Sequence, residues 1–160
     1  MIDVLIVRDP RESARKCSLT PLRGLEHVTF VGFQKGRRVP ADGRLLLHPE
    51  GELLTPADAG RGLLLIDCSW RHVDQVLATI EGELVHRRLP PLRTAYPRAS
   101  KVFADPASGL ASVEALYAAL AILGEPRAEL LAAYHWREAF LEQNPELVVG
   151  GAWAARGGAD

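Results

Sequence analysis

A carboxylate and an aromatic ring stand close together where an apolar run of the chain ends. Residues 62–66 are apolar, Asp67 follows directly, and Trp70 comes three positions later. Such a run is typical of a strand buried on both faces of a parallel sheet, and open α/β sheets bind ligands at the carboxyl ends of their strands. Asp67 could therefore bind a ligand ammonium group or orient a reacting group, and Trp70 could cover the ligand. Alternatively, Asp67 is the N-cap of a following helix, and Trp70 packs in the core.

A second feature with a chemical meaning is a basic segment. Residues 85–104 contain no acidic residue, and Tyr96 and Phe103 are interleaved with the cations. Positive charge follows a phosphate backbone and aromatic rings stack on unpaired bases, so this composition is typical of RNA binding. A solvated loop is the alternative. The candidate RNA-binding residues are Arg87, Arg88, Arg93, Arg98 and Lys101.

Other catalytic and metal-binding patterns are not recognisable. Cys17 and Cys68 are too few for a disulfide framework or a four-cysteine zinc site, and no histidine lies at a diagnostic spacing from them. The five histidines are scattered, and no glycine-rich phosphate motif occurs. We therefore expect a reaction that needs neither a metal nor a covalent enzyme intermediate.

Composition and charge place the chain among ordinary globular domains. It has 160 residues, of which 48% are hydrophobic and 24% charged, close to the averages for soluble proteins. The net charge is −1, yet residues 1–104 hold 16 basic against 12 acidic residues, and residues 105–160 hold 3 against 8. A polyanion could therefore meet one part of the chain only. Without a signal peptide or a long apolar run, we expect a cytoplasmic protein with no membrane partner.

The elements that must hold these residues change in character along the chain. In the first half, apolar runs predict strands, a turn is expected at 48–51, and a very short helix begins at Thr55-Pro56. The predicted strands are 2–7, 27–33, 45–48 and 62–66, followed by a helix over 71–81. In the second half, the apolar spacing predicts helices over 110–123, 126–134 and 135–143.

This order predicts an α/β fold, in which a small, mostly parallel sheet is followed by a helical C-terminal part. We expect a single catalytic domain over residues 1–147 and a flexible tail over residues 148–160. Within the domain, residues 1–60 would form an N-terminal α/β part and residues 61–147 a second part that ends in helices.

Short motifs in a fixed order resemble one protein family. Ile66-Asp67-Cys68-Ser69-Trp70 is the most specific of them. The others are Lys16-Cys17-Ser18, Leu53-Leu54-Thr55-Pro56-Ala57-Asp58, Leu89-Pro90-Pro91-Leu92, Leu110-Ala111-Ser112-Val113-Glu114-Ala115, and Tyr134-His135-Trp136 with Phe140, Leu141 and Asn144. Over about residues 5–145, the chain thus resembles the ribosomal RNA aminocarboxypropyltransferase family of ribosome biogenesis. It resembles a divergent member, because residues 96–100 and the spacing from Asp9-Pro10 to Cys17 depart from the family's pattern.

The resemblance implies a SPOUT-like fold with a trefoil knot, a monomer, and S-adenosylmethionine as donor substrate. It also implies transfer of the donor's 3-amino-3-carboxypropyl group onto a (pseudo)uridine nitrogen of small-subunit ribosomal RNA, with release of methylthioadenosine. By position in the motifs, Asp67 would bind the donor's amino group as the candidate catalytic residue, Trp70 would pack near its methyl group, and Ser18 would hold its carboxylate end. The remaining implied donor contacts are Ile66, Leu89, Ser108 and Ser112.

The chemistry of the sulfonium donor agrees with this assignment. A sulfonium centre makes three carbons electrophilic, and the methyl group is the least hindered. Transfer of the larger group therefore requires a shielded methyl group and a presented methylene, which is catalysis by orientation. Two alternatives use the same scaffold: a SPOUT-type RNA methyltransferase, and a non-catalytic RNA-binding ribosome assembly factor.

Overall fold

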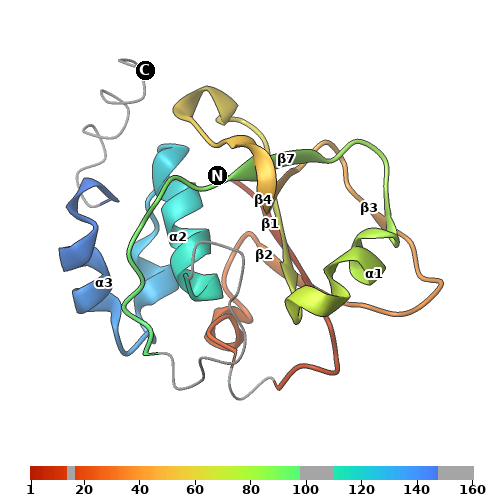
Figure 1. Ribbon diagram of the computed structural model, residues 1–160, viewed down its shortest axis with the longest axis horizontal. Coiled ribbons are helices and arrows are strands. Elements are labelled where there is room, and N and C mark those ends of the chain that lie inside the picture. Colours follow the sequence, from red (N-terminus) through yellow and green to blue (C-terminus); the bar gives the residue numbers. More distant parts are fainter. Residues whose placement is uncertain (14–16, 98–109, 148–160) are drawn as a thin grey trace.

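A five-stranded parallel sheet forms the centre of the computed structural model, which describes residues 1–13, 17–97 and 110–147. The strand order is β2-β1-β5-β4-β7, and every pairing within it is parallel. The strands are β1 Val4–Arg8, β2 Val28–Gly32, β4 Leu45–Leu53, β5 Leu63–Asp67 and β7 Val85–Arg88. A separate parallel pair joins β3 (Val39–Pro40) to β6 (Ile80–Glu81). Figure 1 shows the sheet between helices on its two sides.

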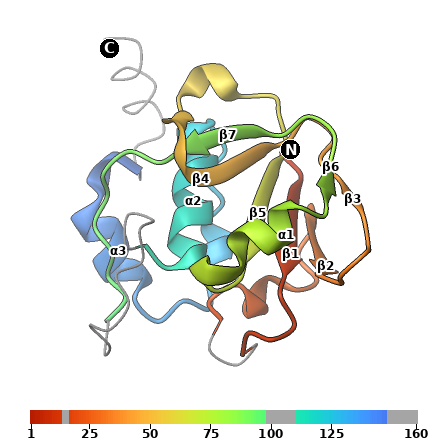
Figure 2. The same ribbon diagram turned by 45° about the vertical axis from the view of Figure 1, so that its right-hand side comes forward.

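The two faces of the sheet belong to two different apolar clusters. On β1, Val4 and Ile6 pack in the cluster that contains helix α2 (Ser112–Ile122). Leu5 and Val7 point the other way, into the cluster that contains helix α1 (Val73–Leu77). Side chains alternate between the faces of a strand, so a continuously apolar strand can serve both clusters. Figure 1 shows α2 and α1 on opposite sides of the strands, and in the turned view of Figure 2 α1 lies in front of them. The prediction of central strands buried on both faces is confirmed.

The helical C-terminal part packs around α2. Nine of the eleven residues of α2 are buried, so this helix lies in the interior on almost every side. Helix α3 (Arg137–Gln143) contributes the buried Phe140. Short 3-10 turns complete the fold at η1 Thr20–Leu22, η2 Pro56–Asp58, η3 Trp70–His72, η4 Ala128–Leu131 and η5 Pro145–Leu147.

Several predicted boundaries are correct, and two local predictions are wrong. The predicted strands at 2–7, 27–33 and 62–66 match β1, β2 and β5 to within two residues. The predicted turn at 48–51 is wrong, because β4 continues to Leu53 with a shift in its pairing to β7 between Leu47 and Glu52. Gly51 allows this irregular stretch, since a Cβ there would lie only 2.5 Å from the backbone nitrogen of Arg87.

The predicted helix over 71–81 is also wrong at its end. Helix α1 stops at Leu77, and the Thr79 hydroxyl donates a hydrogen bond to the Val76 carbonyl (2.7 Å). Ile80 then enters β6, where it pairs with Val39. Thr79 and Ile80 are β-branched and therefore favour the extended pairing over a further helical turn.

The remaining outcomes concern the second half of the chain. The predicted helix over 126–134 shrinks to the 3-10 turn η4, and the strand β7 was not foreseen inside the basic segment. The predicted helices over 110–123 and 135–143 correspond to α2 and α3, each shorter by two or three residues. The flexible tail expected over residues 148–160 lies outside the described residues. None of the helices within the described ranges is long and apolar enough to cross a membrane.

Candidate functional site

Arg8 and Asp67 form an ion pair at the carboxyl edge of the sheet. They are register partners at the ends of β1 and β5, and Arg8 Nε donates to Asp67 Oδ2 over 2.8 Å. Their side chains are 8% and 10% exposed, so the pair is almost completely removed from solvent. The N-cap alternative for Asp67 is wrong, because the N-cap residue of the following η3 is Ser69 and Asp67 points to Arg8 instead.

Cys17 completes the polar contacts of this pair. Its thiol donates to Asp67 Oδ2 (3.1 Å) and accepts a hydrogen bond from Arg8 Nη2 (3.4 Å). Burial, together with the neighbouring Asp67 carboxylate, raises the pKa of the Cys17 thiol. Burial and the carboxylates of Asp9 and Glu12 likewise raise the pKa of Cys68, to about 12. Both cysteines are therefore thiols at neutral pH, unsuited to nucleophilic catalysis.

Arg8 keeps an unused hydrogen-bond donor in this buried place. Its guanidinium lies 4.7 Å from the centre of the Phe30 ring, and its Nη1 is buried without a hydrogen-bond partner within the described part of the chain. Both contacts of Asp67 that involve its side chain end on Oδ2. The pair thus offers one unengaged cationic nitrogen and one carboxylate oxygen at the edge where α/β sheets bind ligands.

Trp70 lies beyond Asp67 on a turn that faces solvent. Its side chain is among the exposed large hydrophobic groups, at 51% exposure. The alternative in which Trp70 packs in the core is therefore wrong. The backbone N–H of Ser69, immediately before it, donates to Glu12 Oε1 over 2.8 Å. Ile66, at the start of the motif, is half-buried against the α1 side of the sheet.

Ser18 contacts the start of α2, next to Ser112, although the two segments are far apart in the sequence. Ser18 Oγ accepts a hydrogen bond from the Val113 N–H (3.0 Å), which joins the residue after Cys17 to the start of α2. The structure therefore brings Ser18, Asp67 and Ser112 into one neighbourhood through Cys17. Leu89 follows β7 and packs against the α2 cluster, and the predicted donor contact Ser108 lies outside the described residues.

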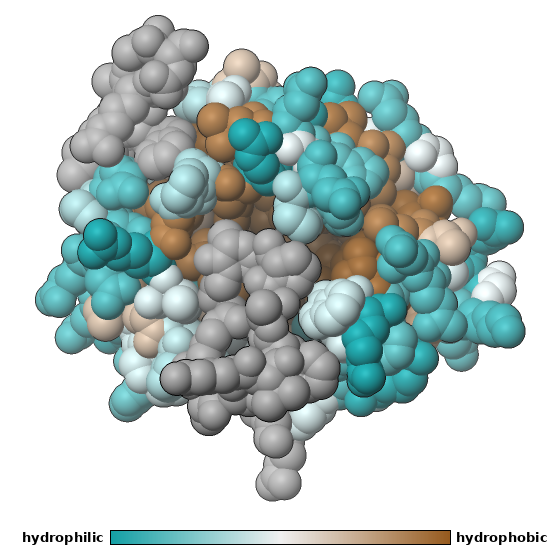
Figure 3. Space-filling model, in the orientation of Figure 1, coloured by the Kyte–Doolittle hydropathy of each residue, from teal (hydrophilic) through white to brown (hydrophobic). Residues whose placement is uncertain are grey.

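One face of the molecule is hollowed and apolar near its centre. Figure 3, in the orientation of Figure 1, shows hydrophobic side chains gathered near the centre of the face, between the positions of α2 and α1, with hydrophilic side chains around them. A pocket of about 290 Å³ lies at the amino ends of β1 and β2, where Met1, Val28, Arg127 and Leu130 line it. None of the predicted donor-binding residues lines that pocket.

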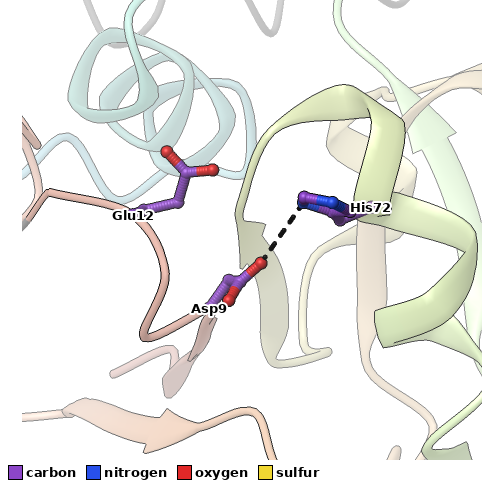
Figure 4. Close-up of side chains that lie close together, drawn as sticks. All are labelled: Asp9, Glu12 and His72. Atoms are coloured by element: carbon purple, nitrogen blue, oxygen red, sulfur yellow. Dashed lines mark ion pairs between the residues drawn. The ribbon is translucent and has the colours of Figure 1, made fainter.

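Asp9, Glu12 and His72 form a cluster beside the ion pair (Figure 4). One ligand atom from each lies within 4.8 Å of the others, a spacing that could hold a metal ion. Arg11 already occupies the Asp9 carboxylate through its backbone N–H, Nε and Nη2, over 2.8–3.1 Å. These hydrogen bonds hold the pKa of Asp9 below its ordinary value. A cation would have to displace Arg11, so the cluster acts as a set of contacts between two loops.

The candidate RNA-binding cations differ in how free they are. Arg87 Nε pairs with Asp58 at 3.2 Å, and Arg88 Nη1 donates to the Gly51 carbonyl (3.0 Å). Arg93 is exposed, and among the described residues its hydrogen bonds are those of its backbone with Asn144. Arg98 and Lys101 lie outside the described residues. Arg87 therefore has a structural role in addition to the predicted one, whereas the side chain of Arg93 is available to a partner.

Arg8 and Glu12 are not among the site residues predicted from the sequence. Arg8 carries the same signal as Asp67, because each is the charged residue that directly follows an apolar run. If both strands are parallel neighbours, these two charges must meet at one edge of the sheet. Glu12 has no such signal, since it acts only through the fold of the loop that carries it.

Comparisons with known proteins identify the family. A family model described as "Ribosome biogenesis protein, C-terminal" matches residues 45–152. The 16S rRNA aminocarboxypropyltransferase of Halobacterium salinarum is 38% identical over 142 residues, which cover 86% of this chain and 77% of that protein. The protein of the same name from Methanopyrus kandleri is 42% identical over 126 residues, or 72% of each chain.

A solved structure agrees with the sequence relatives. The SAM-dependent rRNA:acp-transferase Tsr3 from Vulcanisaeta distributa superposes with a TM-score of 0.69 at 31% identity, over 97% of this chain and 84% of that one. The parallel α/β fold and its carboxyl-edge site thus place the chain in a class of ribosome biogenesis proteins. Within that class, it belongs to the 16S rRNA aminocarboxypropyltransferase family, which confirms the resemblance found in the motifs.

Proposed function

We propose that this chain transfers the 3-amino-3-carboxypropyl group of S-adenosylmethionine onto a (pseudo)uridine nitrogen of small-subunit ribosomal RNA, as a step of ribosome biogenesis. The observation that carries the proposal is the buried Arg8–Asp67 pair at the carboxyl edge of the sheet, in a chain of the aminocarboxypropyltransferase family. The relatives are named for this transfer on 16S rRNA, and the solved neighbour is named as SAM-dependent.

The charges of the site match those of the donor. The amino-acid end of S-adenosylmethionine carries an ammonium and a carboxylate. The site offers the Asp67 carboxylate and Arg8 Nη1, which has no partner among the described residues. Asp67 would bind the ammonium group, and Ser18, next to the start of α2, would lie at the carboxylate end. Ile66, Leu89, Ser108 and Ser112 are the further donor contacts that we propose.

Orientation would do most of the catalytic work. The donor supplies a sulfonium centre, whose three attached carbons are electrophilic. Trp70, exposed on its turn, would shield the methyl group, while Asp67 fixes the ammonium and thereby the methylene. The acceptor nitrogen forms a bond to that methylene, the bond from carbon to sulfur breaks, and the electron pair stays on sulfur in methylthioadenosine. The acceptor nitrogen loses one proton. Because Arg8 and Cys17 already engage Asp67 Oδ2, the other oxygen, Oδ1, would hold the ammonium group of the donor.

We extend the proposal to the architecture and the setting of the reaction. The fold would be SPOUT-like with a trefoil knot, in one catalytic domain over residues 1–147 with parts at 1–60 and 61–147. The protein would act as a monomer in the cytoplasm, away from membranes and without a metal ion. Ribosomal RNA would meet the cations Arg87, Arg88, Arg93, Arg98 and Lys101. Of the first three, which the structure describes, Arg93 is exposed and its side chain has no partner among the described residues.

Three measurements test the proposal. Isothermal titration should show binding of S-adenosylmethionine that Asp67→Ala abolishes, while Glu142→Ala, an exposed acid on α3, leaves it unchanged. Incubation with small-subunit rRNA should then release methylthioadenosine. S-adenosylhomocysteine as the main by-product would instead indicate a methyltransferase, and RNA binding without turnover would indicate an assembly factor. Nucleoside mass spectrometry of the rRNA would identify the transferred group and the acceptor together.

A further inference from the structure

Hydrogen bonds from backbone and side-chain groups connect the loops that follow β1 and β5. Beyond Arg8 and Asp67, the Asp9 N–H donates to the Asp67 carbonyl (2.9 Å), which continues the pairing of the strands into the loops. The Glu12 carboxylate then accepts the Ser69 N–H at 2.8 Å. Figure 4 shows Asp9 and Glu12 on the first loop, with Asp9 directed at His72 on the second.

Two further contacts connect the first loop to the second loop and to α1. His72 Nδ1 is buried and lies 3.6 Å from Asp9 Oδ2. Arg11, held by Asp9, reaches with its Nη2 to Gln75 Oε1 on α1 over 3.0 Å. The loop of residues 9–12 therefore makes four contacts with the other loop and with α1. The Glu12 contact differs from the others because it ends on the backbone next to Trp70.

Glu12 holds the entry to the turn that carries Trp70, by accepting the N–H of its N-cap residue Ser69. The 3-10 turn η3 begins at Trp70, and its N-cap Ser69 makes no capping hydrogen bond with its own side chain. The unpaired N–H groups at the start of a helical turn need acceptors. Glu12 supplies a charged acceptor for one of them, and hydrogen bonds to charged groups are the stronger kind. The direction in which the backbone enters Trp70 thus depends on Glu12.

We propose that Glu12 is a positioning residue that determines which carbon of the donor faces the acceptor. The inference rests on the proposed function, because it concerns the place of Trp70 beside the methyl group. With Glu12 present, Trp70 shields the methyl group, the acceptor nitrogen bonds to the methylene, and methylthioadenosine leaves. Without Glu12, the turn shifts and the methyl group becomes accessible. The nitrogen then bonds to the methyl carbon, the bond from methyl to sulfur breaks, and S-adenosylhomocysteine leaves. In each case, the nitrogen loses one proton.

The test compares Glu12→Ala with Glu12→Gln, which keeps an acceptor oxygen. The readouts are the KM for the donor and the ratio of methylthioadenosine to S-adenosylhomocysteine formed with small-subunit rRNA. For Glu12→Ala we expect KM to rise about tenfold, as for the loss of one hydrogen bond to a charged group. We also expect the product ratio to shift toward S-adenosylhomocysteine. Glu12→Gln should restore both values to near those of the wild type, and Glu142→Ala is the matched control on an exposed acid.

A second variant removes the other partner. Ser69 has φ −61°, which proline adopts, so Ser69→Pro deletes the N–H while residue 12 stays a glutamate, whose carboxylate the proline ring displaces from the turn. It should reproduce the changes in KM and in product ratio. Unchanged KM and product ratio in folded Glu12→Ala and Ser69→Pro, beside a wild type that releases methylthioadenosine, would overturn the role of Glu12 and leave the proposed function intact. A wild type that releases no methylthioadenosine would instead overturn the proposed function.

Discussion

Arg8 and Asp67 are direct register partners on neighbouring parallel strands, and their side chains meet in an ion pair of 2.8 Å that solvent hardly reaches. Each is the first charged residue after an apolar run, so the sheet that buries the runs also brings the two charges together. A buried charge without its partner is expensive. The pair therefore links the stability of the sheet to the binding site at its edge.

Removal of Arg8 should be strongly destabilising. Arg8→Met leaves the Asp67 carboxylate buried without its cation, and we expect the free energy of unfolding to fall by about 3–5 kcal/mol in urea denaturation. Arg71→Met, at an exposed arginine, is the control and should change it by less than about 0.5 kcal/mol. The double variant Arg8→Met/Asp67→Leu should recover most of the loss, because apolar residues can replace a buried pair. An equal loss in the single and double variants would contradict this account.

Glu114 should be a second point of high sensitivity. It is fully buried on α2, and its carboxylate accepts four hydrogen bonds, which come from the Thr94 hydroxyl, the backbone of Ala95 and Ala111, and the Tyr134 hydroxyl. Glu114→Ala leaves these donors without an acceptor and should cost about 3 kcal/mol or more. For a chain of this length, the melting temperature would fall by about 6–12 °C.

Tyr134→Phe is the graded control for Glu114. It deletes one donor and leaves the other three in place, so it should cost about 1.5 kcal/mol. Calorimetry of both variants checks the order of the effects. A melting temperature for Glu114→Ala at or above that of Tyr134→Phe would show that the carboxylate does not organise this region.

Local signals explain which parts of the fold were predictable. Apolar runs and periodic spacing depend on nearby residues only, so they located β1, β5 and the apolar face of α2, and they placed Asp67 at a strand end. Strand β7 was missed because it is a basic edge strand whose pairing with β4 is a long-range property. The contact from Glu12 to Ser69 spans 57 positions and has no pattern in the sequence that would indicate it.

Acid should remove the contribution of Asp9 to stability. Hydrogen bonds from Arg11 hold the pKa of Asp9 below its ordinary value of 3.8. A lowered folded-state pKa means that this contribution is fully present above pH 3.8 and is lost as the pH falls through the lowered pKa. The difference in free energy of unfolding between the wild type and Asp9→Asn should therefore be constant near neutral pH and shrink in acid. Urea titrations at several pH values measure it, and a difference that grows in acid would contradict the assignment.

Two arginines of the basic segment should have different roles: Arg93 should contact RNA, and Arg87 should stabilise the fold. Arg93 is exposed with its side chain unpaired within the described residues, so Arg93→Ala should weaken binding of small-subunit rRNA and reduce the salt dependence, log K against log[salt], by about 0.7–0.9. The variant should leave donor binding and the free energy of unfolding unchanged. Fluorescence anisotropy with a labelled rRNA fragment at several salt concentrations measures the slope of log K against log[salt].

Arg87→Ala is the paired comparison, because Arg87 lies in the same segment but engages Asp58. Its removal leaves the Asp58 carboxylate, which is 14% exposed, without its partner beside β4 and β7. We therefore expect Arg87→Ala to lower the midpoint of urea denaturation, whereas Arg93→Ala does not. If Arg93→Ala left the salt slope of rRNA binding unchanged, Arg93 would have no role as a phosphate contact. If Arg93→Ala lowered the midpoint of urea denaturation, the side chain of Arg93 would have a structural role. Equal midpoints for the wild type and Arg87→Ala would show that the pair with Asp58 adds nothing to the edge of the sheet.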